Sequence, residues 1–234
     1  MAERRAWILG RVGEACARVG RDPSQVTLVA VSKTVDVDAA VAAWRAGYRA
    51  FAENRPQELV RKLAAIEGVP EMATARFDMI GNLQKNKINA VLGRAELVHS
   101  ISSARLAEAV SSRAAARGMV QPVLLEVNVS GEPSKGGFAP SEARQGLEGL
   151  LGLEGIEVRG LMTMAPARDP EAARRTFSGL RELRDGLEAS CGARMPILSC
   201  GMSDDFEIAL EEGSTLIRLG RVVFDPGHGP AGHR

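Results

Sequence analysis

The chain has few of the residues that build disulfide frameworks and metal sites. Only three cysteines, Cys16, Cys191 and Cys200, occur among 234 residues, and the three histidines do not cluster with them. Closely spaced pairs of cysteine and histidine are typical of disulfide scaffolds and zinc sites. We therefore expect no disulfide and no metal site, and the reducing cytoplasm as the location.

Long apolar runs and an excess of one charge are also missing. The first apolar run covers only residues 6–9, which is too short for a signal peptide or a membrane span. Lysine and arginine total 30 against 29 acidic residues, so the net charge is +1. We expect neither nucleic acid nor a membrane as a partner, and we expect the basic run at 84–87 to begin a helix that faces solvent.

Strand-forming and helical patterns alternate about eight times along the chain. Residues 26–33, VTLVAVSK, form an apolar run suited to a buried parallel strand, and a helical pattern from Ile8 to Val19 precedes it. Asp36 can cap the helix that follows. Further strands are expected at 49–52, 76–80, 96–101, 122–129, 157–162, 196–199 and 214–219. Helical patterns lie between them at 54–66, 84–92, 103–117, 140–151, 169–189 and 204–212.

This alternation predicts an α/β fold. A single-domain (β/α)8 TIM barrel over residues 1–224, with an extra N-terminal helix, accounts for eight units better than an open sheet does. The alternative is a doubly wound sheet, but no Gly-x-Gly-x-x-Gly follows the first strand. We expect residues 225–234 to form a flexible C-terminal tail.

Polar residues follow the predicted strands, at the barrel face where catalytic and binding residues gather. They are Lys33, Glu53, Asn54, Gly81, Asn82, Ser100, Ser102, Asn128, Ser130, Thr163, Met164, Gly201, Ser203, Arg218 and Gly220. A lysine in apolar surroundings loses its proton more readily, and Lys33 would then be a nucleophile toward aldehydes. The plainer alternative is a lysine that reaches out to water.

The turn GMSDD after the seventh strand is suited to binding a phosphate. Ser203 offers a hydroxyl beside a helix start, and Gly220 after the eighth strand would complete the site. Asp204 and Glu207 have capping-box spacing. A plain turn is the alternative, and Asp204 and Asp205 suit an anion only if their side chains point away.

Arg218 lies within the last predicted strand. It is either a buried interior arginine that needs partners or a surface residue. An amine, a phosphate site and an arginine on one barrel face together meet the needs of pyridoxal 5′-phosphate.

Six blocks of sequence resemble the pyridoxal-phosphate homeostasis protein family, the YggS/PROSC type. They are VAVSK ending at Lys33, FAENRPQE at 51–58, MIGNLQKNK at 79–87, EVNVSGEPSKGGF at 126–138, GLMTMAP at 160–166 and LSCGMSDDFEIALEEGSTLIRLGRVVF at 198–224. The resemblance implies a barrel akin to the N-terminal domain of bacterial alanine racemase. It implies an internal aldimine at Lys33, Asn54 beside the cofactor, the phosphate on Ser203 and the Gly220 backbone, and Arg218 facing the pyridine nitrogen.

Some positions depart from the family pattern. Ala52 and Asn82 stand where FGEN and IGHLQ are usual, and Asp225 stands at the end of the usual IFG. The resemblance places Lys135 near the cofactor, although a solvated loop lysine is the plainer interpretation. Cys200 is interpreted as a small packed residue rather than a nucleophile.

Three functions remain open. The first is a monomeric carrier that holds pyridoxal phosphate in PLP homeostasis, passes it to apo forms of PLP-dependent enzymes, and has no turnover and hence no catalytic residue. The second is a racemase-like enzyme, which needs a second base that neither Tyr48 nor His99 clearly supplies. The third is a lysine-imine aldolase, which a visible absorbance spectrum would separate from the other two.

Overall fold

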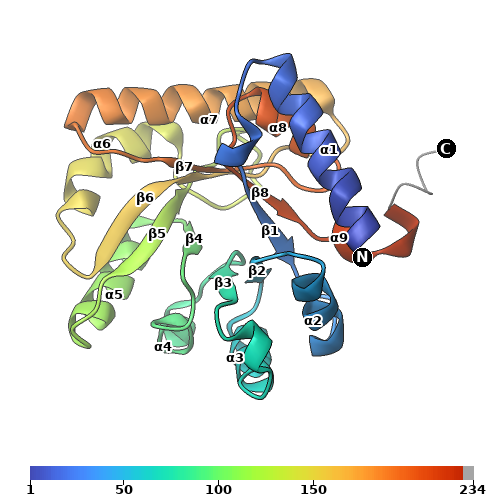
Figure 1. Ribbon diagram of the computed structural model, residues 1–234. Helices are drawn as coiled ribbons and strands as arrows, with labels where there is room; N and C mark the ends of the chain where they lie inside the picture. The colour runs from blue at the N-terminus through green and yellow to red at the C-terminus, as the bar shows by residue number, and fades with distance from the viewer. Residues whose placement is uncertain (229–234) are drawn as a thin grey trace.

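Eight parallel strands close into a barrel in the order of the sequence (Figure 1). The computed structural model describes residues 1–228. The strands are β1 Thr27–Val31, β2 Ala50–Glu53, β3 Arg76–Met79, β4 Val98–Ile101, β5 Gln121–Glu126, β6 Ile156–Met162, β7 Ile197–Ser199 and β8 Leu216–Leu219. Seven of them begin and end within two residues of their expected places, and β5 ends three residues earlier than expected. The predicted (β/α)8 barrel is confirmed.

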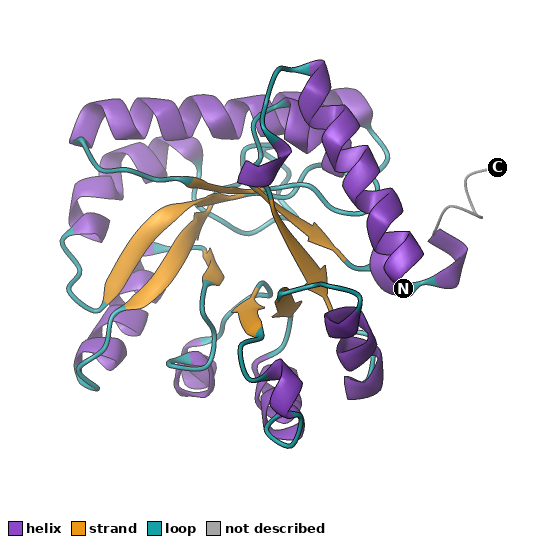
Figure 2. Cartoon of the chain, in the orientation of Figure 1, coloured by secondary structure: helices purple, strands orange, loops and turns teal. Residues whose placement is uncertain are grey.

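Helices surround the barrel (Figure 2). They are α1 Ala2–Arg18, α2 Val37–Arg45, α3 Pro56–Ile66, α4 Ile88–Val91, α5 Ala104–Ala115, α6 Pro140–Leu151, α7 Pro170–Cys191, α8 Phe206–Glu211 and α9 Arg221–Phe224. The extra N-terminal helix is α1, and the Asp36 carboxylate accepts the Ala39 N–H as an N-cap, as expected. The short α9 was not predicted, because four residues are too few to show a period.

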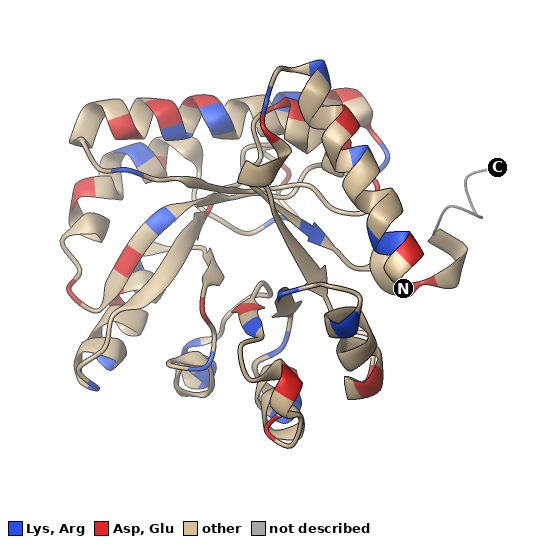
Figure 3. Ribbon diagram, in the orientation of Figure 1, with Lys and Arg blue, Asp and Glu red and all other residues tan. Residues whose placement is uncertain are grey.

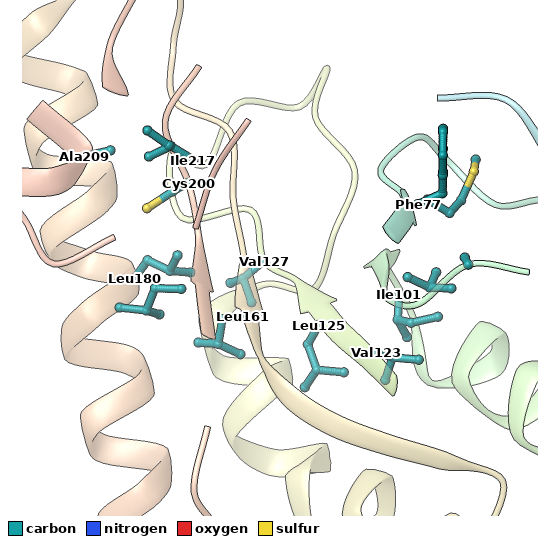
Figure 4. Packing of buried hydrophobic residues seen from close by; sticks show 14 of the residues in the cluster. Phe77, Ile101, Val123, Leu125, Val127, Leu161, Leu180, Cys200, Ala209 and Ile217 are labelled. Carbon is teal, nitrogen blue, oxygen red and sulfur yellow. The ribbon is translucent and has the colours of Figure 1, made fainter. Parts of the chain in front are cut away.

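Two apolar layers hold the barrel. The larger lies between strands and helices, where Leu161 packs beside Leu180 of α7, and Cys200 and Ile217 pack near Ala209 of α8 (Figure 4). The smaller layer fills the inside of the barrel with residues of the strands and with Leu97, which immediately precedes β4. Its members are Val29, Val31, Ala50, Ala52, Leu97, Leu124, Met162 and Leu216. Side chains therefore alternate between the two layers along each strand.

The start of α8 differs from the expected capping box. The Glu207 carboxylate pairs with Arg11 of α1 at 2.5 Å, and Asp204 pairs with Arg221 at 2.5 Å. Asp205 is the residue that precedes the helix, and its carboxylate accepts the Met202 N–H at 2.6 Å. The capping box is therefore wrong, because the tertiary structure brings basic residues to both expected members.

Charged residues of both signs lie together along α1 and α7 (Figure 3). Arg174 and Arg181 of α7 pair with Glu212, and α1 pairs in the same way with α8. Exposed pairs of this kind add little stability each. In the part of the chain that the structure describes, no helix is long and apolar enough to cross a membrane.

The expected flexible tail begins at Asp225. Pro226–His228 form one 3₁₀ turn, and the Arg4 guanidinium donates to the Asp225 carbonyl at 2.6 Å. Residues 229–234 lie outside the described range, so the tail stays a prediction.

Candidate functional site

A cavity of about 510 Å³ opens at the carboxyl ends of the strands. The five expected cofactor-binding residues all line it: Lys33, Asn54, Ser203, Arg218 and Gly220. Of the other polar strand-end residues, Glu53, Ser100, Asn128, Ser130 and Thr163 do not line it. The structure thus brings the five expected residues together from four parts of the barrel wall.

The Lys33 side chain is exposed at this cavity. Its ammonium has no hydrogen bond or ion pair to any residue within 1–228. Of the two interpretations of Lys33, the exposed side chain favours the one that reaches out to water, because the strand ends at Val31 and Lys33 lies in the turn beyond it. The amine is free to meet a ligand.

Arg218 is an interior arginine, only 5% exposed. One of its terminal nitrogens donates to the Ser199 carbonyl at 2.7 Å and hydroxyl at 2.5 Å, and the other donates to the Thr163 carbonyl at 3.0 Å. Three of the five N–H donors are thus used, and the rest remain for a ligand in the cavity. Burial lowers the pKa of the guanidinium from its ordinary value, while charges including the Glu126 carboxyl oppose that shift.

A chain of hydrogen bonds continues from Arg218 across the inside of the barrel. We call Asp78, His99, Ser199 and Arg218 the interior chain. The His99 Nδ1 lies 3.0 Å from the Ser199 Oγ, and its Nε2 lies 3.2 Å from the Asp78 carboxylate. Burial lowers the His99 pKa, although Asp78 opposes the shift. In the neutral tautomer with a proton on Nε2, every bond from Arg218 to Asp78 has one donor and one acceptor.

The segments that follow β7 and β8 can receive an anion in the cavity. The Ser203 hydroxyl accepts the Val222 N–H at 3.2 Å, which leaves its own proton free to donate. Within residues 1–228, the backbone N–H groups of Ser203 and Gly220 have no acceptor. Asp204 and Asp205 line a neighbouring cavity instead of this one. The Asp204 carboxylate pairs with Arg221, and the Asp205 carboxylate accepts the Met202 N–H.

Asn54 is positioned by close contact between the loops after β2 and β3. A Cβ on Gly81 would lie 2.0 Å from the Asn54 carbonyl oxygen, so only glycine fits at residue 81. The Asn54 side chain lines the main cavity and a smaller one that contains Arg55 and Lys87. It can therefore contact a ligand from the side of β2.

Comparisons with known proteins identify the family. The family model described as "Alanine racemase, N-terminal domain" matches residues 15–225. A pyridoxal phosphate homeostasis protein of Aquifex aeolicus is 39% identical over 95% of this chain and 96% of its own length. One of Escherichia coli is 34% identical over 96% of this chain and 95% of its own length. The chain belongs to the pyridoxal phosphate homeostasis protein family.

Solved structures agree with this family. The PipY protein of Synechococcus elongatus, in a structure with PLP bound, superposes with a TM-score of 0.80 at 32% identity over 91% of this chain and 99% of its own. A protein of unknown function from Bifidobacterium adolescentis reaches 0.89 at 39% identity, covering 95% of this chain and 94% of its own. The alanine racemase of E. faecalis shares the fold with a TM-score of 0.70 at 17% identity, covering 97% of this chain and 59% of its own.

Glu126 is a cavity residue that the sequence reasoning missed. It ends β5, is 8% exposed and lines the cavity, and its side-chain carboxyl makes no hydrogen bond within residues 1–228. Burial raises the pKa of its carboxyl, while Arg218 acts against the shift. The sequence offered one signal, a carboxylate directly after the apolar run 122–125, since acidic residues are rarely buried.

The structure contradicts the plainer interpretation of Lys135 and agrees with the interpretation of Cys200. Lys135 lines the cavity and pairs with Glu132, so the interpretation as a solvated loop lysine is wrong. Asn128 holds this loop by donating to the Glu132 and Lys135 carbonyls. Cys200 is packed as expected, and burial raises its pKa to about 11, so it is a protonated thiol at neutral pH.

Proposed function

We propose that this chain binds pyridoxal 5′-phosphate covalently at Lys33, holds it, and passes it to apo forms of PLP-dependent enzymes without turnover. The observation that carries the proposal is one cavity that combines a free amine, a fixed guanidinium and unpaired N–H donors. Its volume of about 510 Å³ is within the range of small-molecule sites. The PLP-bound PipY structure supports the choice of ligand.

Each residue has a distinct part in holding this ligand. When bound, pyridoxal phosphate supplies an aldehyde that condenses with an amine and a ring that withdraws electrons. The Lys33 amine is placed to reach the aldehyde carbon, and the remaining Arg218 donors suit the ring nitrogen. Ser203 and the Gly220 N–H suit the phosphate, because both offer unused donors.

Two features support storage rather than catalysis. Arg218 can only donate a hydrogen bond, so it favours an unprotonated ring nitrogen, which withdraws electrons weakly. Within residues 1–228 no second domain covers the cavity, and the Lys33 side chain is exposed. An incoming amine of an acceptor enzyme can therefore reach the imine. We propose that the carrier acts as a monomer in the cytoplasm.

Absorbance spectroscopy tests this function. Purified protein mixed with pyridoxal phosphate should show a yellow imine band, and borohydride followed by peptide mapping should place the reduced adduct on Lys33. Transfer is tested by adding an apo PLP-dependent enzyme and following its recovered activity. A protein that gives no band would overturn the proposed function.

A racemase-like activity is the second candidate, and Glu126 is the observation in its favour. A buried carboxyl with a raised pKa, in the same cavity as Lys33, could act as an acid or base. The holoprotein should be incubated with each L-amino acid in deuterated water, and Cα exchange followed by NMR. Negligible exchange supports the carrier, whereas rapid exchange that Glu126→Gln abolishes would establish the enzyme.

A further inference from the structure

A buried ammonium lies behind the segment that carries Lys33. Lys62 of α3 is 1% exposed, although a lysine is rarely fully buried unless its charge is paired. Its Nζ donates to the Ser32 carbonyl at 2.6 Å, to the Val35 carbonyl at 3.0 Å and to the Glu53 Oε1 at 2.6 Å. All three donors of the ammonium are therefore used.

Its partner Glu53 faces α3 rather than the cavity. The Glu53 Oε1 accepts from Lys62 and from the Ser32 hydroxyl, each at 2.6 Å. The Oε2 is buried with no partner among the described residues. A buried ion pair with an unpaired oxygen is a poor source of stability, because the loss of hydration offsets most of the attraction.

The two carbonyls bound by Lys62 lie on either side of Lys33. Ser32 and Val35 also bond to each other, since the Val35 N–H donates to the Ser32 carbonyl at 3.2 Å. The Ser32 N–H is tied to β2 through the Ala52 carbonyl at 3.0 Å. The backbone of this turn is thus fixed at both ends, while the Lys33 side chain remains free.

We propose that Lys62 and Glu53 are a positioning pair that holds the 32–35 turn so that the Lys33 amine faces the cavity. This inference rests on the proposed function. Neither Lys62 nor Glu53 lines the cavity. We therefore expect the pair to affect how the Lys33 amine approaches the aldehyde. Orientation of this kind contributes to the rate of bond formation, because the reacting atoms need not be brought into line at each encounter.

The main test is the double variant Glu53→Leu/Lys62→Met, which removes both charges and leaves no buried ion unpaired. We expect imine formation with pyridoxal phosphate to slow at least tenfold in stopped-flow absorbance. Binding of pyridoxine 5′-phosphate, which has no aldehyde and cannot form the imine, should stay within about twofold of the wild type. Amide exchange of residues 32–35 should become faster.

Arg61→Met is the matched control, because it removes a neighbouring cation of α3 whose ion pair, with Glu58, lies at the surface. It should leave the imine rate, the pyridoxine 5′-phosphate affinity and the amide exchange unchanged.

Glu53→Gln provides a second variant if the double variant does not fold, and we expect an intermediate slowing of imine formation. It keeps an acceptor of similar size for Lys62.

The outcomes separate this inference from the proposed function. A wild-type protein that forms no imine overturns the proposed function itself. An unchanged imine rate in the folded variants overturns the positioning pair. A parallel loss of imine rate and pyridoxine 5′-phosphate affinity also overturns it, since that result indicates a general collapse of the cavity.

Discussion

Lys33 and Arg218 lie at the ends of neighbouring strands, β1 and β8, and both reach the same cavity. The structure holds the backbone of Lys33 in place but holds the side chain of Arg218. For Lys33 the backbone is held from behind by Lys62, and the side chain is exposed and unbonded. For Arg218 the side chain itself is buried and bonded to Ser199 and Thr163.

This difference matches the two tasks that the cavity requires. A nucleophilic amine must move to the aldehyde and release it again, so its side chain has to be free. A donor to the ring nitrogen acts by staying in place, so its side chain has to be rigid. The contrast predicts that changes at Lys33 abolish imine formation without changing stability, and that changes at Arg218 lower stability without preventing imine formation.

The largest effect is expected at Lys33. Lys33→Ala should abolish the imine band, and Lys33→Arg should do so while keeping the charge. Neither should change the free energy of unfolding by more than about 0.5 kcal/mol, because the side chain is exposed and unbonded. Borohydride reduction with mass spectrometry, and urea unfolding, check both parts. An imine in Lys33→Ala would place the cofactor on another lysine, with Lys135 the first suspect.

Ser203 should give the next largest effect. Ser203→Ala removes one donor to the phosphate, which is worth about 1.5 to 3 kcal/mol for a charged acceptor, or roughly ten- to a hundredfold in affinity. The imine should still form at saturating pyridoxal phosphate. Equilibrium titration measures the loss. An unchanged affinity would show that the phosphate is held elsewhere in the cavity.

Arg218→Lys tests whether the buried and bonded side chain of Arg218 contributes to stability. An ammonium cannot reproduce the fork that binds Ser199 and Thr163 together, so at least one buried carbonyl loses its partner. We expect a loss of about 1 to 3 kcal/mol in the free energy of unfolding, with the imine still formed. Urea unfolding and absorbance are the measurements. Full stability would show that the contrast with Lys33 is wrong.

The smallest effect is expected at His99, which should make the free energy of unfolding depend on pH. Burial lowers the pKa of His99 in the folded chain below the ordinary 6.5. As the pH falls below 6.5, the unfolded chain therefore binds a proton at His99 that the folded chain does not. Stability from this group is present above pH 6.5 and is lost as the pH falls below it. From pH 7.5 to 5.5, the wild type should lose about 1 kcal/mol more than His99→Gln, which keeps a donor toward Asp78. Equal losses in urea unfolding would contradict this.

Much of the fold could be predicted because its causes are local. Apolar runs of strand length alternate with helical periods, and every strand was found within three residues of its expected bounds. The interior chain could not be predicted, because Asp78, His99 and Ser199 come from three different strands. Their contact depends on closure of the barrel, which no local pattern encodes.

The sequence by itself determined the barrel and the residues that lie at its strand ends. Only the tertiary structure decided which of those side chains enter the cavity. Asn54 lines it, whereas the adjacent Glu53 faces Lys62 of α3, and Glu126 turns inward from a run that reads as plain strand. The physical reason is the two-residue period of a strand. An error of one residue in a strand's end exchanges the two faces, and only the pairing with neighbouring strands removes that ambiguity.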